Sequence, residues 1–385
     1  MSGDKRMSNK QKSNAEVNFQ FKLLSAVGIF IIVAGHCYKG GFSLLSNWFP
    51  NYSYNIALFV FISGYFYNEK HDDKPFTYIF KRTKRLLFPA YIWNLVYGAL
   101  AWILQQNGFE YWNKIDAYSL FIMPLVDGED LHFNLGSWFV YPLFLVCVIN
   151  VVLRRLLKIR NWNNDYFLLL VYLCGGMASI YCVIYYQPMN HGVMKLLFRT
   201  LFMLPMYQLG RLYRTKLEQY DSLKNPIYFG ILFVVQLILL TFFHNLEYYP
   251  SSMTNFNNGL ILPYVTAVTG IAFWLRVSRI LAPAVSDRRF VCLIADNTYH
   301  IMIHHMFGFW CVKMIFYVLY EVFGWFDEAV WTQMFQNFWW YYLPKGITEY
   351  AIAYVAGGFV VSILIGKLSS STKIFFYNRI IKRKV

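Results

Sequence analysis

The sequence predicts an all-α, polytopic integral membrane protein of about ten transmembrane helices, with both termini in the cytoplasm. Hydrophobic residues make up 57% of the 385-residue chain and charged residues only 14%, whereas soluble domains carry about 25% charged residues. Apolar segments of spanning length recur along the chain, and about 20 apolar residues cross a bilayer as a helix. Lys and Arg gather in alternate connections between these segments, as they do in cytoplasmic loops.

Ten segments are apolar and long enough to be predicted as spans. In chain order they are residues 20–40, 52–68, 86–106, 134–153, 166–186, 193–212, 226–244, 258–278, 294–320 and 347–366. The second is short and the ninth is long for a hydrocarbon core of about 30 Å. The chain shows no repeat, no low-complexity linker and no appended soluble domain, so residues 1–385 are predicted to form a single membrane domain. It has a polar N-terminal tail at 1–18 and a basic C-terminal tail at 369–385.

The basic residues set the predicted orientation. With the N-terminus inside, the predicted inner segments hold 29 of the 35 Lys and Arg residues, as the positive-inside rule requires. The predicted outer segment 107–133 carries five acidic residues and only one Lys or Arg. Residues 328–343 are predicted as an aromatic helix on the outer surface, and the basic residues 75–85 as its counterpart on the inner surface. The expected location is the cell membrane, of the bacterial inner or plasma type.

Composition also argues against several other classes of protein. The net charge of +15 is explained by the cytoplasmic bias of the loops, so we expect no nucleic-acid partner. The six cysteines form no CxxC pair and lie mostly in apolar runs, which argues against a disulfide framework or a bound metal. The sequence lacks the motifs of P-loop NTPases, dinucleotide-binding proteins, HExxH metallopeptidases and GxSxG hydrolases. The polar start of the chain is unlike a cleavable signal peptide.

His36 is the first candidate functional residue, because burying an ionisable side chain in lipid is costly. It lies 14 residues after Lys22, or about 21 Å along a helix, which places it in the outer half of the membrane. An imidazole there can act as a general base near neutral pH; a histidine at the outer interface, bonded to water, is the alternative. No carboxylate is adjacent in the sequence, so an acidic partner would have to come from a distant outer residue such as Glu129.

Further ionisable residues fall within or beside the predicted spans. His304 and His305 point about 100° apart on a helix, so one is expected to face a cavity while the other packs in the core. Arg199 enters the sixth span from outside, where a buried guanidinium needs a partner or an anion. Lys313 is expected to extend outward to water. His132 lies at the outer mouth of the fourth span, where a solvated loop histidine is equally expected.

Several short motifs, taken in order, resemble the acyltransferase-3 family of membrane O-acyltransferases. FKLLSAVGIFIIVAGHCY is similar to that family's first helix, which ends in a histidine, here His36. LFVFISGYFYN resembles the second helix, and FKRTKRLLFPAYIW resembles the basic stretch that enters the third. GSWFVYPLF resembles a helix with a WFL core through Trp138, and LPMYQLGRLYR a segment with Pro205 and Gly210. ADNTYHIMIHH is similar to a late segment whose histidine aligns with His305.

The resemblance implies transfer of an acyl group, most often acetyl, from cytoplasmic acyl-CoA to a hydroxyl of a surface polysaccharide or lipid-linked sugar. The expected donor is acetyl-CoA, and no metal is expected. His36 would be the general base, and His305 or Arg199 would stabilise the oxyanion. The donor-binding residues are expected to be Lys22, Lys81, Arg82, Arg85 and Arg211, and the acceptor-binding residues His132 and Trp138. The family often carries a basic residue eleven positions before the first-helix histidine, where this chain has Ser25.

Two other functional classes stay open. A glycan exporter or flippase on the same scaffold would move glycan without consuming acyl-CoA, since a fold alone does not fix function. A membrane module that senses or carries a small solute would need coupling carboxylates deep in its spans, whereas Asp296 and Glu321 lie near span ends. Membrane lipid is expected to surround the protein, and the sequence leaves open whether copies of the chain form a homo-oligomer.

Overall fold

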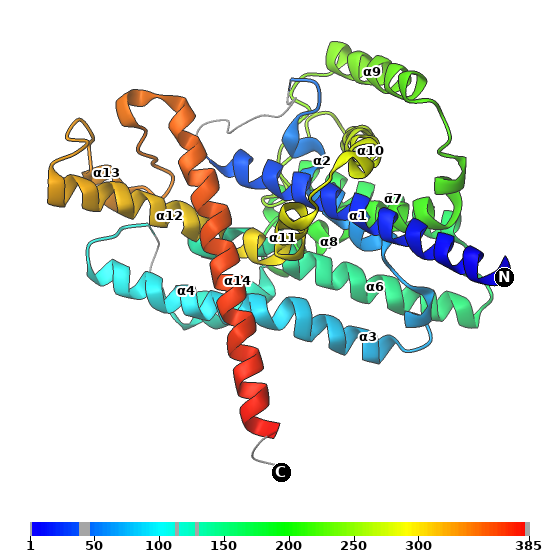
Figure 1. Ribbon diagram of the computed structural model, residues 1–385, viewed down its shortest axis with the longest axis horizontal. Helices are drawn as coiled ribbons and strands as arrows, with labels where there is room; N and C mark the ends of the chain where they lie inside the picture. The colour runs from blue at the N-terminus through cyan, green and yellow to red at the C-terminus, as the bar shows by residue number, and fades with distance from the viewer. Residues whose placement is uncertain (1, 38–46, 112–114, 128–130, 382–385) are drawn as a thin grey trace.

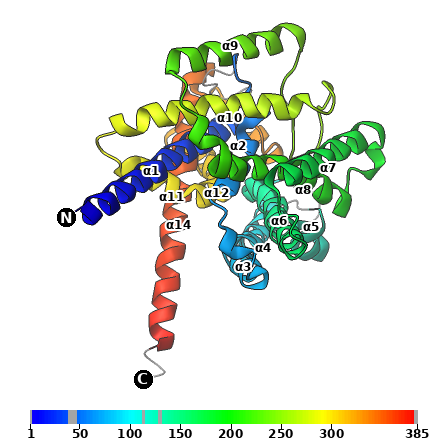
Figure 2. The ribbon, with the colours of Figure 1, turned by 90° about the vertical axis from the view of Figure 1, so that its right-hand side faces the viewer.

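The computed structural model describes residues 2–37, 47–111, 115–127 and 131–381. Every regular element in this part of the chain is a helix (Figures 1 and 2). Most helices pack into one bundle. The helix α9 stands off at its edge, and the end of α14 projects beyond it (Figure 2). An isolated β-bridge between Tyr249 and Thr254 closes a turn in the connection between α9 and α10.

Each of the ten predicted spans coincides with a helix. In chain order these are α1 (Ser2–His36), α2 (Asn51–Tyr65), α4 (Phe88–Gln106), α6 (Val140–Ile159), α7 (Asp165–Tyr185), α8 (Gly192–Leu212), α9 (Asn225–Phe242), α10 (Leu262–Leu281), α12 (Thr298–Phe323) and α14 (Ala351–Ile381). The remaining α-helices are short: α3 (Pro75–Arg82), α5 (Met123–Val126), α11 (Arg289–Asp296) and α13 (Thr332–Gln336).

Eight helical segments within the described residues are long and apolar enough to cross a membrane. They are Glu16–His36, Pro75–Gln106, His132–Ile159, Asp165–Tyr185, Asn225–Phe242, Leu262–Ala284, Thr298–Phe323 and Thr348–Ser369. The helix α2 falls outside this set because it has only 15 residues. The helix α8 falls outside it because Lys195, Arg199 and Arg211 make it too polar. The count of ten spans and the cytoplasmic position of both termini remain predictions.

The two helices outside this set lie inside the bundle, where protein surrounds them. At the point where α2 crosses α8, a Cβ added to Gly64 would lie 1.8 Å from the carbonyl oxygen of Tyr207. A Cβ added to Gly210 would lie 2.0 Å from the carbonyl oxygen of Phe61. The two backbones are therefore in direct contact, as small residues allow in membrane helix pairs. A short or polar helix is tolerated here because neighbouring helices, and not lipid, cover it.

Two segments differ from the surface helices that the sequence predicts. Residues 75–85 do not form a separate surface helix: α3 continues through a π-helical turn, η2 (Thr83–Leu87), directly into α4 (Figure 1). Residues 328–343 form only the five-residue helix α13, and the rest of the segment is irregular and folds against α12. The basic residues of the first segment and the aromatic residues of the second predict contact with the membrane surface, but their partners in the bundle decide where they lie.

Candidate active site

Two histidines from distant parts of the chain meet at one end of the bundle. His36 is the last residue of α1, and His305 lies in the first half of α12. The His36 Nδ1 atom is 3.0 Å from the His305 Nε2 atom, and the two nearly parallel rings have centroids 5.1 Å apart. His305 is fully buried, whereas His36 is half-buried and lines a cavity. The structure therefore brings together both histidines that the sequence singles out for catalysis.

The backbone of α12 determines the tautomer of both rings. The Nδ1 atom of His305 lies 2.9 Å from the carbonyl oxygens of Ile301 and Met302. Carbonyl oxygens only accept hydrogen bonds, so Nδ1 carries the proton, and Nε2 of the neutral His305 ring accepts from His36 Nδ1. The Nε2 atom of His36 is then left without a proton. This assignment follows from the hydrogen-bond network, and it makes His36 Nε2 the free base of the pair.

A cavity of about 740 Å³ opens beside His36. Its lining combines aromatic rings with side-chain amides and consists of Gly35, His36, Tyr52, Gln333, Asn337, Trp339, Trp340 and Tyr341. The Tyr52 hydroxyl donates to the carbonyl of Gly35 at 3.1 Å, and the Tyr341 hydroxyl donates to the carbonyl of His36 at 3.2 Å. Two walls of the cavity are thus bonded to the last turn of α1. Such a lining suits a ligand that has both flat apolar faces and hydroxyl groups.

The 3-10 helix η4 (His132–Phe139) presses against α12 beside the histidine pair. A Cβ added to Gly136 would lie 2.1 Å from the carbonyl oxygen of Met302 and 3.1 Å from Cε1 of His305. Gly136 therefore allows a backbone approach that holds the His305 ring in place. Its presence in GSWFVYPLF is a signal that sequence reasoning missed. His132, at the start of η4, packs its ring 4.9 Å from that of Phe338.

Lys313 secures the segment that walls the cavity. Its side chain is 1% exposed, Nζ donates to the carbonyl of Phe338, and the same Nζ lies 4.6 Å from the centre of the Tyr341 ring. The prediction that Lys313 extends to water is wrong, because residues 328–343 fold back over α12 and enclose it. Sequence reasoning did not select Lys313, Gln333 or Asn337 as site residues, since none belongs to a local motif.

Arg199 joins two connections between helices. Its guanidinium donates to the backbone carbonyls of Asp127, at 2.9 Å, and Ser251, and its Cζ atom lies 5.2 Å from the Trp138 ring centre. Arg199 of α8 and Trp138 of η4 are thus in contact with each other, and both are buried. Glu129, considered as an acidic partner for His36, lies outside the described residues.

The opposite end of the bundle carries dense positive charge. The helix α2 begins beside the His36 cavity, which Tyr52 lines, and ends at the opposite end of the bundle. The connection at residues 66–74 therefore lies away from the cavity. Here Lys158 of α6 donates to Asp73 at 2.7 Å and lowers the pKa of that carboxyl. Lys22, further from His36 along α1, forms an ion pair with Asp296 at 2.8 Å.

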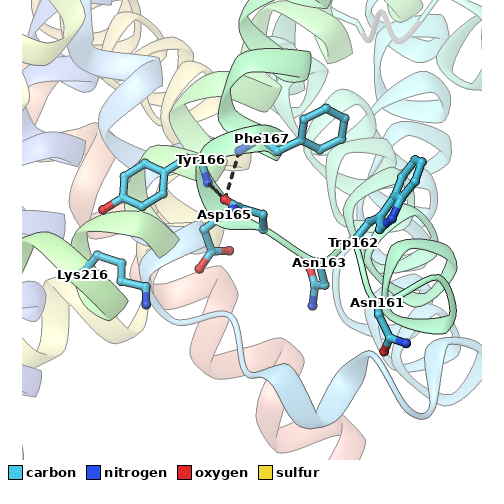
Figure 3. A pocket seen from close by; sticks show the side chains of 8 residues that line it. Asn161, Trp162, Asn163, Asp165, Tyr166, Phe167 and Lys216 are labelled. Carbon is cyan, nitrogen blue, oxygen red and sulfur yellow. Dashed lines mark hydrogen bonds between the residues drawn. The ribbon is translucent and has the colours of Figure 1, made fainter.

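Arg211 lies in a buried ion cluster at this end. The Asp165 carboxylate accepts from Arg154 at 2.8 Å and from Arg211 at 3.0 Å, and Arg211 also pairs with Glu69 at 2.7 Å. A pocket of about 640 Å³ adjoins the cluster, lined by residues 161–167 and Lys216 (Figure 3). Two carboxylates already neutralise Arg211, so it is a less available anion ligand than an unpaired cation would be.

The remaining predicted donor ligands lie on α3 and the π-helical turn. Arg82 is half-buried, and its Nε donates to the Tyr78 hydroxyl at 3.1 Å. Lys81 and Arg85 are exposed. Tyr299, near the start of α12, donates to the carbonyl of Leu86 at 2.7 Å and so ties this basic turn to the helix that carries His305. In the described residues, no group of three or more His, Cys, Asp or Glu side chains is arranged to hold a metal ion.

Comparison with known proteins places this architecture in a family. A family model described as an acyltransferase domain, that of the acyltransferase-3 family, matches residues 19–367. This range includes both histidines, the aromatic cavity and the basic turn. No curated protein sequence and no solved structure matches the chain. The eight apolar helices together with this match indicate a multi-pass membrane protein of the transferase class. The chain belongs to the acyltransferase-3 family.

Proposed function

We propose that the protein is a membrane O-acetyltransferase that moves an acetyl group from cytoplasmic acetyl-CoA to a hydroxyl of a surface polysaccharide or lipid-linked sugar. The observation that carries the proposal is the His36–His305 pair at the wall of a cavity lined by aromatic rings and amides. The family supplies the reaction class, which is acyl transfer. The histidine pair supplies a base, and the cavity suits an acceptor that bears hydroxyl groups.

The chemistry follows from the unprotonated His36 Nε2. This atom takes the proton of the acceptor hydroxyl as the oxygen attacks the thioester carbonyl. A new C–O bond forms, the C–S bond of the donor breaks, and the proton held on His36 passes to the departing CoA thiolate. His305 keeps His36 in the required tautomer throughout, because its Nδ1 remains bonded to the α12 backbone. Arg199 is also a proposed oxyanion ligand. Its guanidinium donates to the backbone carbonyls of Asp127 and Ser251, which lie in two connections between helices.

The acceptor is proposed to bind in the His36 cavity. Trp339 and Trp340 offer ring faces for a sugar ring, and Gln333 and Asn337 offer amide groups for its hydroxyls. His132 does not line this cavity but packs behind its wall, against Phe338 and Trp339. Trp138, the other predicted acceptor ligand, does not line the cavity either and lies against Arg199.

The donor is proposed to bind at the basic end of the bundle. Its phosphates suit Lys81, Arg82 and Arg85, which lie on one helical turn tied to α12 by Tyr299. Lys22 and Arg211 are supporting cations, since carboxylates already pair with both. From Tyr299 to His305 the α12 helix rises about 9 Å. The pantetheine arm of a donor whose phosphates bind the basic turn would therefore run along the first half of α12 toward His36.

The test uses the purified full-length protein in lipid nanodiscs. Radiolabelled acetyl-CoA is added with a lipid-linked sugar or a soluble oligosaccharide, and labelled product and free CoA are measured. The proposal expects both products to rise together. A glycan exporter would move or bind the sugar without releasing CoA, and that result would remove the enzymatic function.

A further inference from the structure

An apolar groove runs between α1, α11 and α14. It has a volume of about 530 Å³ and is lined only by apolar side chains, among them Phe30 of α1, Leu293 of α11 and Ile352, Ala356 and Leu364 of α14. The groove exists because α11 has only eight residues and rises about 12 Å. It therefore fills the angle between α1 and α14 over less than half of the hydrocarbon thickness of a bilayer, about 30 Å.

The first turn of α14 brings the groove next to the His36 cavity. Cys37, directly after His36, donates its thiol hydrogen to the carbonyl of Ala351 at 3.3 Å. Tyr341, which lines the cavity, packs its ring 5.1 Å from the ring of Tyr354 on α14. Gly35 and His36 of α1 line the cavity and Phe30 of the same helix lines the groove, while Tyr341 in the cavity wall packs on the first turn of α14.

We infer that the groove holds the hydrocarbon tail of a lipid-linked acceptor while the sugar head group of that lipid occupies the His36 cavity. This inference rests on the proposed function and selects a lipid-linked sugar over a free polysaccharide. Along α14 the groove runs from Ile352 to Leu364, about 18 Å, and one leaflet of the hydrocarbon core is about 15 Å deep. A tail whose polar end lies at the level of the cavity would follow α14 for that length and reach the α11 wall, which lies toward the Lys22–Asp296 pair at the other end of the bundle.

The side chains that line the groove suit a hydrocarbon tail better than a polar head group. No polar or charged side chain interrupts the groove, so it offers burial of apolar surface and no hydrogen bond. The polar and aromatic groups that recognise a sugar are instead gathered in the adjoining cavity.

The test fills the groove with a larger side chain. Ala356 is exposed on the groove wall, and Ala356→Trp is expected to raise KM for a polyprenyl-phosphate-linked sugar at least tenfold. The kcat/KM for a soluble oligosaccharide carrying the same sugar is expected to stay within twofold. The matched control is Ala99→Trp, which places the same ring on an exposed site of α4. This control should leave KM and kcat/KM unchanged for both acceptors. Leu364→Trp, at the far end of the groove, should impair long-tailed acceptors and spare short-tailed ones.

Two results would overturn the inference while leaving the proposed function intact. One is wild-type protein that acetylates the soluble sugar as efficiently as the lipid-linked sugar. The other is an Ala356→Trp variant that loses activity equally on both acceptors, or that discriminates long-chain from acetyl donors. Failure of the wild type to release CoA with any acceptor would remove the proposed function and the inference together.

A direct binding measurement needs no turnover. A lipid-linked sugar with a photoreactive diazirine in its tail is expected to cross-link to peptides covering 352–364, and Ala356→Trp should reduce that cross-link at least fivefold. Cross-linking spread evenly over all lipid-facing helices would show ordinary bilayer contact and would contradict a specific groove.

Discussion

At the scale of single residues, His36 and His305 have different tasks although both are histidines. His305 is fully buried and bonded through Nδ1 to two backbone carbonyls, so its ring orientation and tautomer are fixed. His36 is half-buried, and its second nitrogen is available at the cavity. This division makes His36 the group that handles the proton and His305 the residue that positions it.

Replacing His36 tests the first of these tasks. His36→Ala is expected to lower kcat by about 10²–10⁴-fold, the range for loss of a general base, and to leave KM for acetyl-CoA nearly unchanged. The assay is release of CoA in the presence of acceptor, with the thermal unfolding midpoint as the control for folding. Undiminished turnover by a folded His36→Ala protein would exclude this residue as the base.

Replacing His305 tests the second task. His305→Phe keeps a ring in the same space but removes the acceptor for His36 Nδ1, and kcat is expected to fall about tenfold or more with little change in either KM. His305→Gln restores an oxygen acceptor and should recover part of the lost kcat. If the two variants are equally impaired, His305 acts through packing alone.

At the scale of elements, close helix crossings hold the site together. The α2–α8 crossing depends on Gly64 and Gly210, and the α12–α14 crossing brings Gly308 against Gly358, where an added Cβ would lie 2.7 Å from the Gly358 Cα atom. Because α1, α2 and α12 surround the histidine pair, small errors in these crossings would displace the His36 and His305 rings.

A glycine substitution measures how much the α2–α8 crossing contributes. Gly64→Ala forces a methyl group onto the Tyr207 carbonyl and is expected to destabilise the fold by about 1–3 kcal/mol, as overpacking does. The matched control is Gly175→Ala on α7, where the nearest atom would be the Leu201 Cδ2 at an ordinary 3.5 Å. The measurement is the unfolding midpoint of each variant in the same detergent. Equal midpoints for Gly64→Ala and the wild type would show that α2 and α8 can move apart in the folded protein without loss of stability.

The sequence predicts most helices but few of their contacts. Apolar runs locate all ten helices that coincide with predicted spans, because a spanning segment is recognised from its own apolar composition. The His36–His305 contact joins residues 269 positions apart, and no local pattern encodes it. The cost of burying an ionisable side chain singles out His36 and the pair His304 and His305, and the family resemblance selects His305 from that pair. Residues 328–343 were predicted on the surface because their aromatic content suits an interface, yet the buried Lys313 and the aromatic rings of α12 hold them over the bundle.

At the scale of the whole molecule, the two ends of the bundle differ in chemistry. One end carries the histidine pair and the aromatic cavity, and the other carries Arg154, Arg211 and the basic turn at residues 81–85. Under the proposed function, donor and acceptor would approach from opposite sides of the membrane. The reaction would then carry an acetyl group across the bilayer without moving CoA or sugar across it.

Orientation in the membrane is therefore the prediction on which this arrangement depends. Asn257 and Lys216 are exposed residues in the connections on either side of α9. In intact cells, a membrane-impermeant thiol reagent is expected to label Asn257→Cys, and to label Lys216→Cys only after permeabilisation, since basic connections stay in the cytoplasm. The wild-type chain gives the background from its six native cysteines. The reverse pattern would place the His36 cavity in the cytoplasm, where donor and acceptor would meet on the same side and no acyl group would need to cross the bilayer.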